Sequence, residues 1–296
     1  MTRIALIGPG AIGGTVGFAL AQKGHDLVIC ANGKFSELAL TRSDTQERRA
    51  LPVTVATSPT EVDPVDWVLL CVKSHQTPSA AGWLKAAIGP RTRIAVLQNG
   101  VEHRQTVAPY IGAGNAVVPI VVMLPAERTA PGEITTFGGA ALTAPDDAAA
   151  RTFAGLFAGT FVKVTTDADF VSRAWEKLCM NACSGSLCAI MNHPAALAAY
   201  LDLRPLGERI VEEVMTVGRA EGARFADGFA RQIVGLFTHP GGRGNSMYYD
   251  RRDGKPLEWD ARNGVIQRLG VKHGIATPVA DTIVPLLKAL SVTEPN

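Results

Sequence analysis

RIALIGPGAIGG, residues 3–14, is the stretch of this sequence that decides the fold. A short apolar run leads directly into Gly8, Gly10 and Gly13, and a helix-forming pattern follows. In such a turn the first glycine allows a tight bend, the second lets a pyrophosphate approach the backbone, and the third lets the helix pack against the strand. The stretch therefore predicts a strand, a phosphate-binding turn and a helix whose first N–H groups face the phosphates.

The flanking sequence favours nucleotide binding over a glycine turn that binds nothing. The helical pattern ends at Lys23 and Gly24, as is typical of a glycine-capped helix. A second apolar segment, residues 27–30, completes a βαβ unit of suitable length. We expect the cofactor to contact the whole turn, which consists of Gly8, Pro9, Gly10, Ala11, Ile12 and Gly13.

Composition indicates a soluble, cytoplasmic protein of two domains. The chain has 296 residues, 47% of them hydrophobic, and a formal net charge of +2, so nucleic acid is not an expected partner. No apolar run reaches the ~18–20 residues that span a bilayer, so we expect no membrane association. The five cysteines form no CxxC pair, and the six histidines lack metal-ligand spacing, which predicts reduced thiols and no metal.

The secondary-structure pattern changes near the middle of the chain. Short β-rich runs alternate with other segments at residues 53–56, 67–72, 93–97, 116–124, 134–136 and 161–164. Helix-length patterns follow at residues 206–220, 229–237 and 279–290. We predict an α/β protein, with a Rossmann-type doubly wound sheet that binds a dinucleotide at 1–167 and an all-α substrate and catalytic domain at 168–296. The run 116–124 is predicted as one buried strand although Pro119 interrupts it.

Polar residues follow two of the predicted strands. Lys73 comes after the run 67–72, and Asn99 comes after the run 93–97. Ligands of doubly wound sheets bind at the carboxyl ends of the strands. Lys73 would then pair with cofactor or substrate charge, and Asn99 would offer a donor and an acceptor near the nicotinamide. A solvated lysine and a simple tight turn are the competing interpretations.

The segment WEKLCMN, residues 175–181, places Lys177 and Asn181 four apart on a predicted helix, so both side chains share one face. Lys177 stands among apolar residues, where an ammonium loses its proton more readily. Such a lysine suits the protonation of a developing alkoxide. The competing interpretation is a solvated helical lysine.

The segment SMYYDRRDGKPLEWDARNG, residues 246–264, combines Ser246, Glu258 and Asn263 with aromatic residues. These polar groups suit a ligand site. A helix cap at Ser246 and an exposed acidic face explain the same residues without a ligand, and the spacing leaves both interpretations open.

Together these motifs resemble the ketopantoate reductase (2-dehydropantoate 2-reductase) family over almost the whole chain. Their order is the family's, with GPGAIG at 8–13, CVKSHQT at 71–77, QNG at 98–100, the two segments above, and RLGVKHGIATPV at 268–279. The resemblance implies a Rossmann domain followed by a helical domain. It also implies an NADPH-dependent enzyme of pantothenate biosynthesis that reduces a 2-oxo acid to a 2-hydroxy acid in the cleft between the domains.

The same resemblance implies roles for single residues. Lys177 would be the general acid, and Glu258 would bind the substrate hydroxyl and help to hold Lys177. Asn99 and Asn181 would orient the substrate and the nicotinamide, and Ser246 would contact the substrate carboxylate. The resemblance thus assigns the catalytic step to the second domain.

The chain departs from the family pattern in the substrate region. The family usually carries an asparagine where this chain has Gly185, and often another further along that helical region, where Ala195 or a neighbour stands in this chain. We therefore expect a small 2-oxo acid, either 2-dehydropantoate or a related compound.

The end of the second predicted strand favours NADP(H) over NAD(H). NAD-specific enzymes usually carry an acidic residue there, which holds the ribose hydroxyls. This chain has Asn32 and Lys34 instead, so no carboxylate repels a 2′-phosphate and a lysine attracts it, although the family's usual arginine near Asn32 is absent. By resemblance, Lys73 adds positive charge on the cofactor side.

Other interpretations remain open at this stage. A related β-hydroxyacid dehydrogenase would carry a similar lysine and asparagine pair, and a non-catalytic NADP(H)-sensing protein would keep the nucleotide fold without turnover. His75 and His103 are alternative acids because both follow strand ends. The sequence leaves the oligomeric state open, with a homodimer considered beside a monomer.

Overall fold

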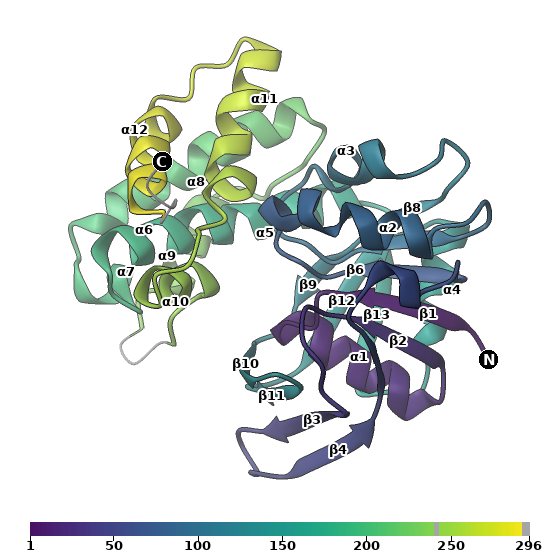
Figure 1. The fold of residues 1–296 in the computed structure, drawn as a ribbon. Helices are drawn as coiled ribbons and strands as arrows, with labels where there is room; N and C mark the ends of the chain where they lie inside the picture. Colours follow the sequence, from purple (N-terminus) through teal and green to yellow (C-terminus); the bar gives the residue numbers. More distant parts are fainter. Residues whose placement is uncertain (240–242, 292–296) are drawn as a thin grey trace. The chain divides into compact units, whose positions relative to one another are not determined.

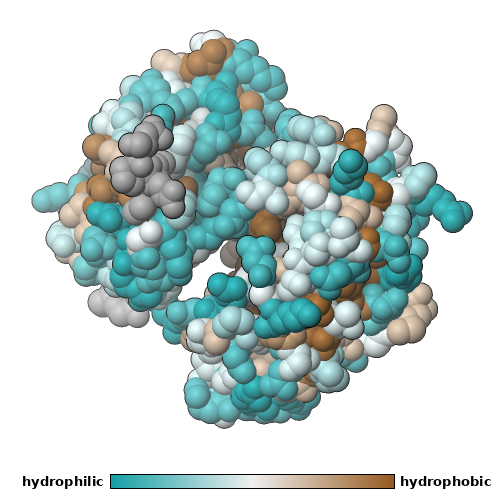
Figure 2. Space-filling model, viewed as in Figure 1, coloured by the Kyte–Doolittle hydropathy of each residue, from teal (hydrophilic) through white to brown (hydrophobic). Residues whose placement is uncertain are grey.

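The computed structural model describes residues 1–239 and 243–291 and divides the chain into two compact units, Met1–Phe170 and Val171–Asn296. The first unit is α/β and the second is helical, which confirms the predicted fold class (Figure 1). The face drawn in Figure 2 is mainly hydrophilic on both units. Within the described ranges, no helix is both long enough and apolar enough to cross a membrane.

A six-stranded parallel sheet forms the centre of unit 1. Its strand order, β5-β2-β1-β6-β7-β8, is that of a Rossmann fold, whose two halves meet between β1 and β6. The strands are β1 Arg3–Ile7, β2 Asp26–Cys30, β5 Thr54–Ala56, β6 Trp67–Leu70, β7 Arg93–Val96 and β8 Val117–Pro119. The reversal of strand order places a topological switch point at the carboxyl ends of β1 and β6, where ligands bind in this architecture.

Both faces of this sheet are buried. The neighbouring residues Leu6 and Ile7 of β1 belong to different core clusters, because successive side chains of a strand point to opposite faces. Helix α1 (Ala11–Lys23) contributes to the cluster of Leu6, and helix α2 (Ala81–Ala87) contributes to that of Ile7. Burial on both sides explains why the strand sequence is continuously apolar.

Two smaller sheets complete unit 1. One has the order β10-β11-β3-β4 and the other the order β13-β12-β9. Their strands are β3 Glu37–Arg42, β4 Arg48–Pro52, β10 Ala126–Ala130, β11 Glu133–Thr136, β9 Val121–Met123, β12 Ala140–Pro145 and β13 Val162–Asp167. The remaining α-helices of the unit are α3 His103–Val107 and α4 Ala148–Leu156.

The prediction of one strand over residues 116–124 is wrong. This run divides into β8, which ends at Pro119 in the six-stranded sheet, and β9, which pairs with β12 in another sheet. β8 is the edge strand of its sheet, where a proline is tolerated because its missing N–H would face away from β7. The pairing with β7 ends one residue later, where Ile120 N donates to the carbonyl oxygen of Val96, and the chain then changes sheets.

The described part of unit 2 is helical. Its α-helices are α5 Phe170–Met180, α6 Ser186–Met191, α7 Ala196–Ala199, α8 Leu203–Ala220, α9 Phe229–Leu236, α10 Ser246–Arg252, α11 Val265–His273 and α12 Pro278–Leu290. Helix α8 contacts α9, α11 and α12, and the three predicted helices are confirmed as α8, α9 and α12. Two further segments are π-helical, η5 (Asn181–Gly185) and η6 (Asp260–Gly264), and they contact each other. Such segments occur frequently at functional sites.

Candidate active site

The turn between β1 and α1 has the geometry of a dinucleotide-binding site. Gly8 has a φ of +92°, and a Cβ there would come within 2.6 Å of Val72 Cγ1. A Cβ on Gly13 would collide with the carbonyl oxygen of Gly8, whereas no described atom lies within 4 Å of a Cβ built on Gly10. The three glycines thus provide a bend, a close packing contact and an open approach for a phosphate.

The start of helix α1 suits an anion. Its N-cap is Gly10, which has no side chain to accept hydrogen bonds from the first helical turn. The first N–H groups therefore stay available to a ligand, and the helix dipole favours negative charge there. The residues of this turn fit a pyrophosphate.

The other predicted cofactor residues of unit 1 follow three strands of the same sheet. Asn32 and Lys34 are exposed after the end of β2. Lys73 is partly buried after β6, and Asn99 is partly buried after β7, where Gly100 turns the chain with a φ of +104°. Because β2, β6 and β7 are parallel, their carboxyl ends lie at one edge of the sheet.

The sequence analysis missed the role of Gln98, whose side chain ties the ends of β6 and β7 together. Its amide Nε2 donates to the carbonyl oxygen of Val72 at 3.0 Å and to the hydroxyl of Thr77 at 2.8 Å. Gln98 is 5% exposed, so these bonds are shielded from water. The motif QNG contains the residue, but the bonds require the two strand ends to be adjacent in space.

The two histidines considered as alternative acids differ in their surroundings. His103 is buried, and its Nε2 lies 3.0 Å from the carbonyl oxygen of Gln98, which gives the ring a fixed place in the link between the strands. His75 is exposed in the short helix η2 (Ser74–Gln76). The buried ring of His103 thus has a structural role, whereas the ring of His75 is exposed to solvent and has no buried site in which to act as an acid.

In unit 2, Lys177 lies on α5 between the buried residues Trp175 and Leu178. Burial lowers the pKa of its amine to about 8, and the positive charge of Arg262 acts in the same direction. The negative charge of Glu258 raises that pKa. The structure therefore brings Lys177 under the influence of two charged residues from a distant part of the chain, one of which the sequence analysis named.

The π-helical segment η5 links α5, which carries Lys177, to the later part of unit 2, which carries Ser246 and Glu258. It starts at Asn181, directly after α5. The carbonyl oxygen of Ala182 accepts a hydrogen bond from Asn263 Nδ2 at 3.2 Å, and that of Ser184 accepts one from Asn245 Nδ2 at 3.0 Å. Asn245, just before the segment 246–264, and Asn263, within it, thus bind the backbone that follows the segment 175–181, so that residues far apart in the sequence share one region.

Arg262 is a site residue that the sequence analysis missed. Its Nη2 donates to Ser246 Oγ at 2.8 Å and to Glu258 Oε2 at 3.1 Å. The side chains of Arg262 and Glu258 are 2% and 3% exposed, respectively. The four-residue spacing of Glu258 and Arg262 was the available signal, because opposite charges at that spacing pair on one helical turn.

The interpretation of Ser246 as a helix cap is wrong. The cap of α10 is the preceding residue, Asn245, whose side chain accepts a hydrogen bond from the backbone N–H of Tyr248 at 3.0 Å. Ser246 is the first residue of the helix and is exposed, while its hydroxyl accepts from Arg262. The hydroxyl is thus tied to the charged group and not to the helix backbone.

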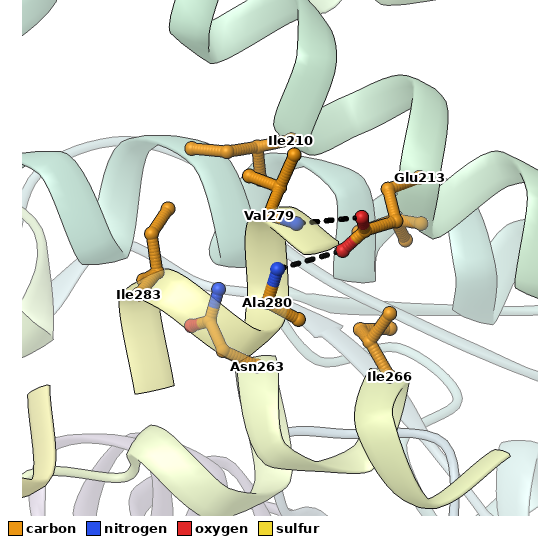
Figure 3. Close-up of a pocket in the computed structure, with 8 residues that line it drawn as sticks. Ile210, Glu213, Asn263, Ile266, Val279, Ala280 and Ile283 are labelled. Atoms are coloured by element: carbon orange, nitrogen blue, oxygen red, sulfur yellow. Dashed lines mark hydrogen bonds between the residues drawn. The ribbon is translucent and has the colours of Figure 1, made fainter. Parts of the chain in front are cut away.

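A cavity of about 10 Å³ lies inside unit 2, beside Asn263 (Figure 3). The Glu213 carboxylate on its wall accepts hydrogen bonds from the backbone N–H groups of Val279, at 2.8 Å, and Ala280, at 2.7 Å (Figure 3). These bonds cap the start of α12. The volume suits about one water molecule and is too small for a 2-oxo acid, so the cavity belongs to the packing of the helices.

Unit 1 is a Rossmann sheet with an open glycine turn. Unit 2 is helical and holds a lysine whose pKa is lowered near a buried carboxylate. Together these features define the class of nucleotide-dependent oxidoreductases. Comparison with known proteins identifies its family. The family described as Ketopantoate reductase PanE/ApbA matches residues 4–148, and its C-terminal counterpart matches residues 169–291. The chain belongs to the ketopantoate reductase family.

Individual relatives match over their full length. The 2-dehydropantoate 2-reductase of Caulobacter vibrioides is 43% identical and covers 99% of this chain and 100% of its own. That of Mycobacterium tuberculosis is 42% identical, with 98% of both chains covered. Among solved structures, the 2-dehydropantoate 2-reductase from Geobacter metallireducens has a TM-score of 0.89 at 27% identity and covers 98% of this chain and 100% of its own.

Proposed function

We propose that this chain catalyses the NADPH-dependent reduction of 2-dehydropantoate to pantoate, the reaction for which its relatives are named. The observation that carries the proposal is the Lys177 amine, whose pKa of about 8 results from burial and from Arg262, against the effect of Glu258. At neutral pH such an amine is mainly protonated, yet it releases its proton more easily than an ordinary lysine. It is therefore suited to act as an acid.

The residues of unit 2 handle the substrate in this proposal. Lys177 donates a proton from Nζ to the carbonyl oxygen of the substrate as negative charge develops there. Glu258 accepts a hydrogen bond from the substrate hydroxyl and holds the ammonium of Lys177 in place. Asn181 orients the substrate from the start of η5, and Ser246 donates to the substrate carboxylate.

The residues of unit 1 hold the cofactor, which supplies a hydride to the keto carbon when bound. The backbone of the glycine turn binds the pyrophosphate, and Asn99 orients the nicotinamide and the substrate. The proposed cofactor contacts are Gly8, Pro9, Gly10, Ala11, Ile12, Gly13, Asn32, Lys34, Lys73 and Asn99. Lys34 and Lys73 place positive charge near the phosphates, and Asn32 brings no carboxylate that would repel a 2′-phosphate.

Steady-state kinetics test this proposal. The wild-type protein is expected to oxidise NADPH in the presence of 2-dehydropantoate, with a higher kcat/KM than with smaller 2-oxo acids or with NADH. Oxidation of a 3-hydroxy acid with NADP⁺ at a higher efficiency would instead favour a β-hydroxyacid dehydrogenase. NADPH binding without reduction of any 2-oxo acid would favour a sensing protein.

The proposal extends to a homodimer in the cytoplasm. It is supported by the likeness to a dimeric ketopantoate reductase from Staphylococcus aureus, with a TM-score of 0.87 at 25% identity over 97% of this chain and 98% of that one. All five cysteines are free, which suits a reducing compartment. Light scattering tests the assembly, because the chain mass is 31.2 kDa and a dimer has twice that mass.

A further inference from the structure

We infer that Arg262 is a positioning residue, whose guanidinium holds the Ser246 hydroxyl as a hydrogen-bond donor for the substrate carboxylate and fixes Glu258 beside it. This inference rests on the proposed reduction of a 2-oxo acid. It adds a residue that acts on the substrate through its neighbours.

Nη2 of Arg262 connects two oxygen atoms. An Nη group of arginine carries two hydrogens, and here one is directed to Ser246 Oγ and the other to Glu258 Oε2. Both oxygens are therefore held within about 3 Å of the same atom. Nε of Arg262 has no hydrogen-bond partner among the described residues, so the bonds of Nη2 set the orientation of the guanidinium.

These bonds determine what the Ser246 hydroxyl can offer to a ligand. A guanidinium only donates hydrogen bonds, so the hydroxyl oxygen must accept from Arg262. Asn245 already caps helix α10, so the hydroxyl is not needed by the backbone of the first turn. Ser246 is exposed and Arg262 is buried behind it, which leaves the hydroxyl hydrogen for an acceptor on the solvent side. A carboxylate is the acceptor that a hydroxyl polarised by a cation binds best.

The charges around this hydroxyl also favour an anionic ligand. Lys177 and Arg262 are cations, and both interact electrostatically with the carboxylate of Glu258. The three side chains together carry a formal charge of +1. Burial of an ion pair costs desolvation energy, and excess buried positive charge is stabilised when an anion binds. A 2-oxo acid carries one negative charge and matches this excess.

The backbone beside the guanidinium leaves room for it. A Cβ on Gly185 of η5 would lie 3.3 Å from Nη1 of Arg262, which is closer than side chains normally pack. A side chain at position 185 would therefore displace the guanidinium. Gly185 and Arg262 form a complementary pair, and G185A offers a way to move the guanidinium while its charge is kept.

The test compares four variants, R262M, R262K, S246A and G185A, with the matched control R268M. Arg268 is an exposed arginine of the neighbouring helix α11 that pairs with Asp260 at the surface. The measurements are KM for 2-dehydropantoate, KM for NADPH, kcat, the Kd of pantoate with NADP⁺ present, and the thermal unfolding temperature.

We expect R262M and S246A each to raise KM for 2-dehydropantoate and Kd for pantoate by about tenfold, the effect of losing one hydrogen bond to a charged group. R262K and G185A should cause smaller increases, and KM for NADPH should stay within about twofold in every variant. In the S246A background, R262M or R262K should change KM by less than in the wild type, because the part of the effect that acts through the hydroxyl is already lost and only the part through Glu258 remains. R268M should behave as the wild type.

The KM of the double variants, S246A combined with R262M or R262K, decides whether the inference holds. Additive effects of S246A with R262M or R262K on KM would overturn it, as would a loss of thermal stability in R262K with an unchanged KM for the substrate. If R262M does not fold, the R262K and G185A results decide. An active wild-type enzyme with an unaffected R262K variant would refute this inference but leave the proposed function intact. A wild type without turnover and without pantoate binding would refute both.

Discussion

The two units build their functional sites from different parts of the polypeptide. In unit 1 the site is a contiguous turn, residues 8–13, in which backbone N–H groups and missing side chains provide the binding surface. In unit 2 the site consists of charged and polar side chains on α5, on α10 and on residues 258–262, which run into η6. A backbone site depends on shape, whereas a side-chain site depends on electrostatics.

This difference predicts two kinds of failure. A side chain added to the turn of unit 1 should weaken cofactor binding and leave the proton-transfer step unchanged. A charge removed from unit 2 should change kcat or its pH dependence and leave cofactor binding unchanged. Variants of each unit, measured for both turnover and cofactor affinity, test whether the two kinds of failure are separate.

Replacement of the proposed acid should cause the largest loss. In K177M, kcat for 2-dehydropantoate should fall by about 10²–10⁴-fold, the usual contribution of a positioned general acid. The Kd for NADPH, measured by fluorescence, should stay within about twofold of the wild-type value, because the residue acts on the substrate. The control K272M removes an exposed lysine that pairs with Glu221 and should keep full activity. Equal losses of turnover and of NADPH affinity would contradict the separation.

A side chain in the glycine turn should give the opposite pattern. In G13A the new Cβ collides with the carbonyl oxygen of Gly8, and relief of such overpacking costs about 1–3 kcal/mol. We expect KM for NADPH to rise about 10- to 100-fold, with the pH dependence of kcat preserved. The control G139A adds a Cβ where no described atom lies within 4 Å, and its KM should not change. A shift of the pH profile in G13A would show that the two sites are not separable.

Much of unit 1 was predictable because its signals are local. The apolar run of β1, the glycines and the cap at Gly24 lie within one short stretch, and the structure has the strand, turn and helix there. Strands β4 and β10 were missed because most of their residues are exposed, so their sequences lack a clear apolar pattern. In β3 only the three central residues are buried, and so short an apolar run does not by itself predict a strand. The division at Pro119 was missed because a break within an apolar run does not tell which sheet the next residues join.

The site of unit 2 was less accessible to sequence reasoning. The four-residue spacing of Lys177 and Asn181 predicts a shared helix face, whereas in the structure Lys177 lies on α5 and Asn181 begins η5. The pairing of Arg262 with Ser246 joins residues on different elements, and no local pattern encodes that contact. The π-helical geometry of η5 and η6 also depends on contacts across the unit, since Asn245 and Asn263 bind carbonyl oxygens of η5. The resemblance to the family implied roles for Ser246 and Glu258, but it implied none for Arg262.

The pH dependence of kcat/KM, which reports ionisations of the free enzyme, should reveal the electrostatics of unit 2. Reduction requires the protonated amine of Lys177, whose pKa is about 8, so kcat/KM for 2-dehydropantoate should fall about tenfold per pH unit above that value. Oxidation of pantoate requires the neutral amine, so its kcat/KM should rise with pH up to the same value. Glu258 raises this pKa, so the alkaline limb of E258Q should move to lower pH. A kcat/KM that stays constant between about pH 6 and pH 10 would contradict the role of Lys177.

The smallest effect is expected at the exposed end of β2, where unit 1 relies on a side chain instead of its backbone. Lys34 is exposed, and exposed ion pairs contribute about 0.2–1 kcal/mol, so K34Q should raise KM for NADPH by up to about fivefold and leave KM for NADH unchanged. High salt should reduce this difference, and the control K163Q, at an exposed lysine of β13, should show none. If K34Q leaves the ratio of the two cofactors unchanged, the preference for NADPH must come from the lack of a carboxylate at this strand end. N32D, which adds one, should then lower the efficiency with NADPH more than K34Q does, because a carboxylate repels the 2′-phosphate directly.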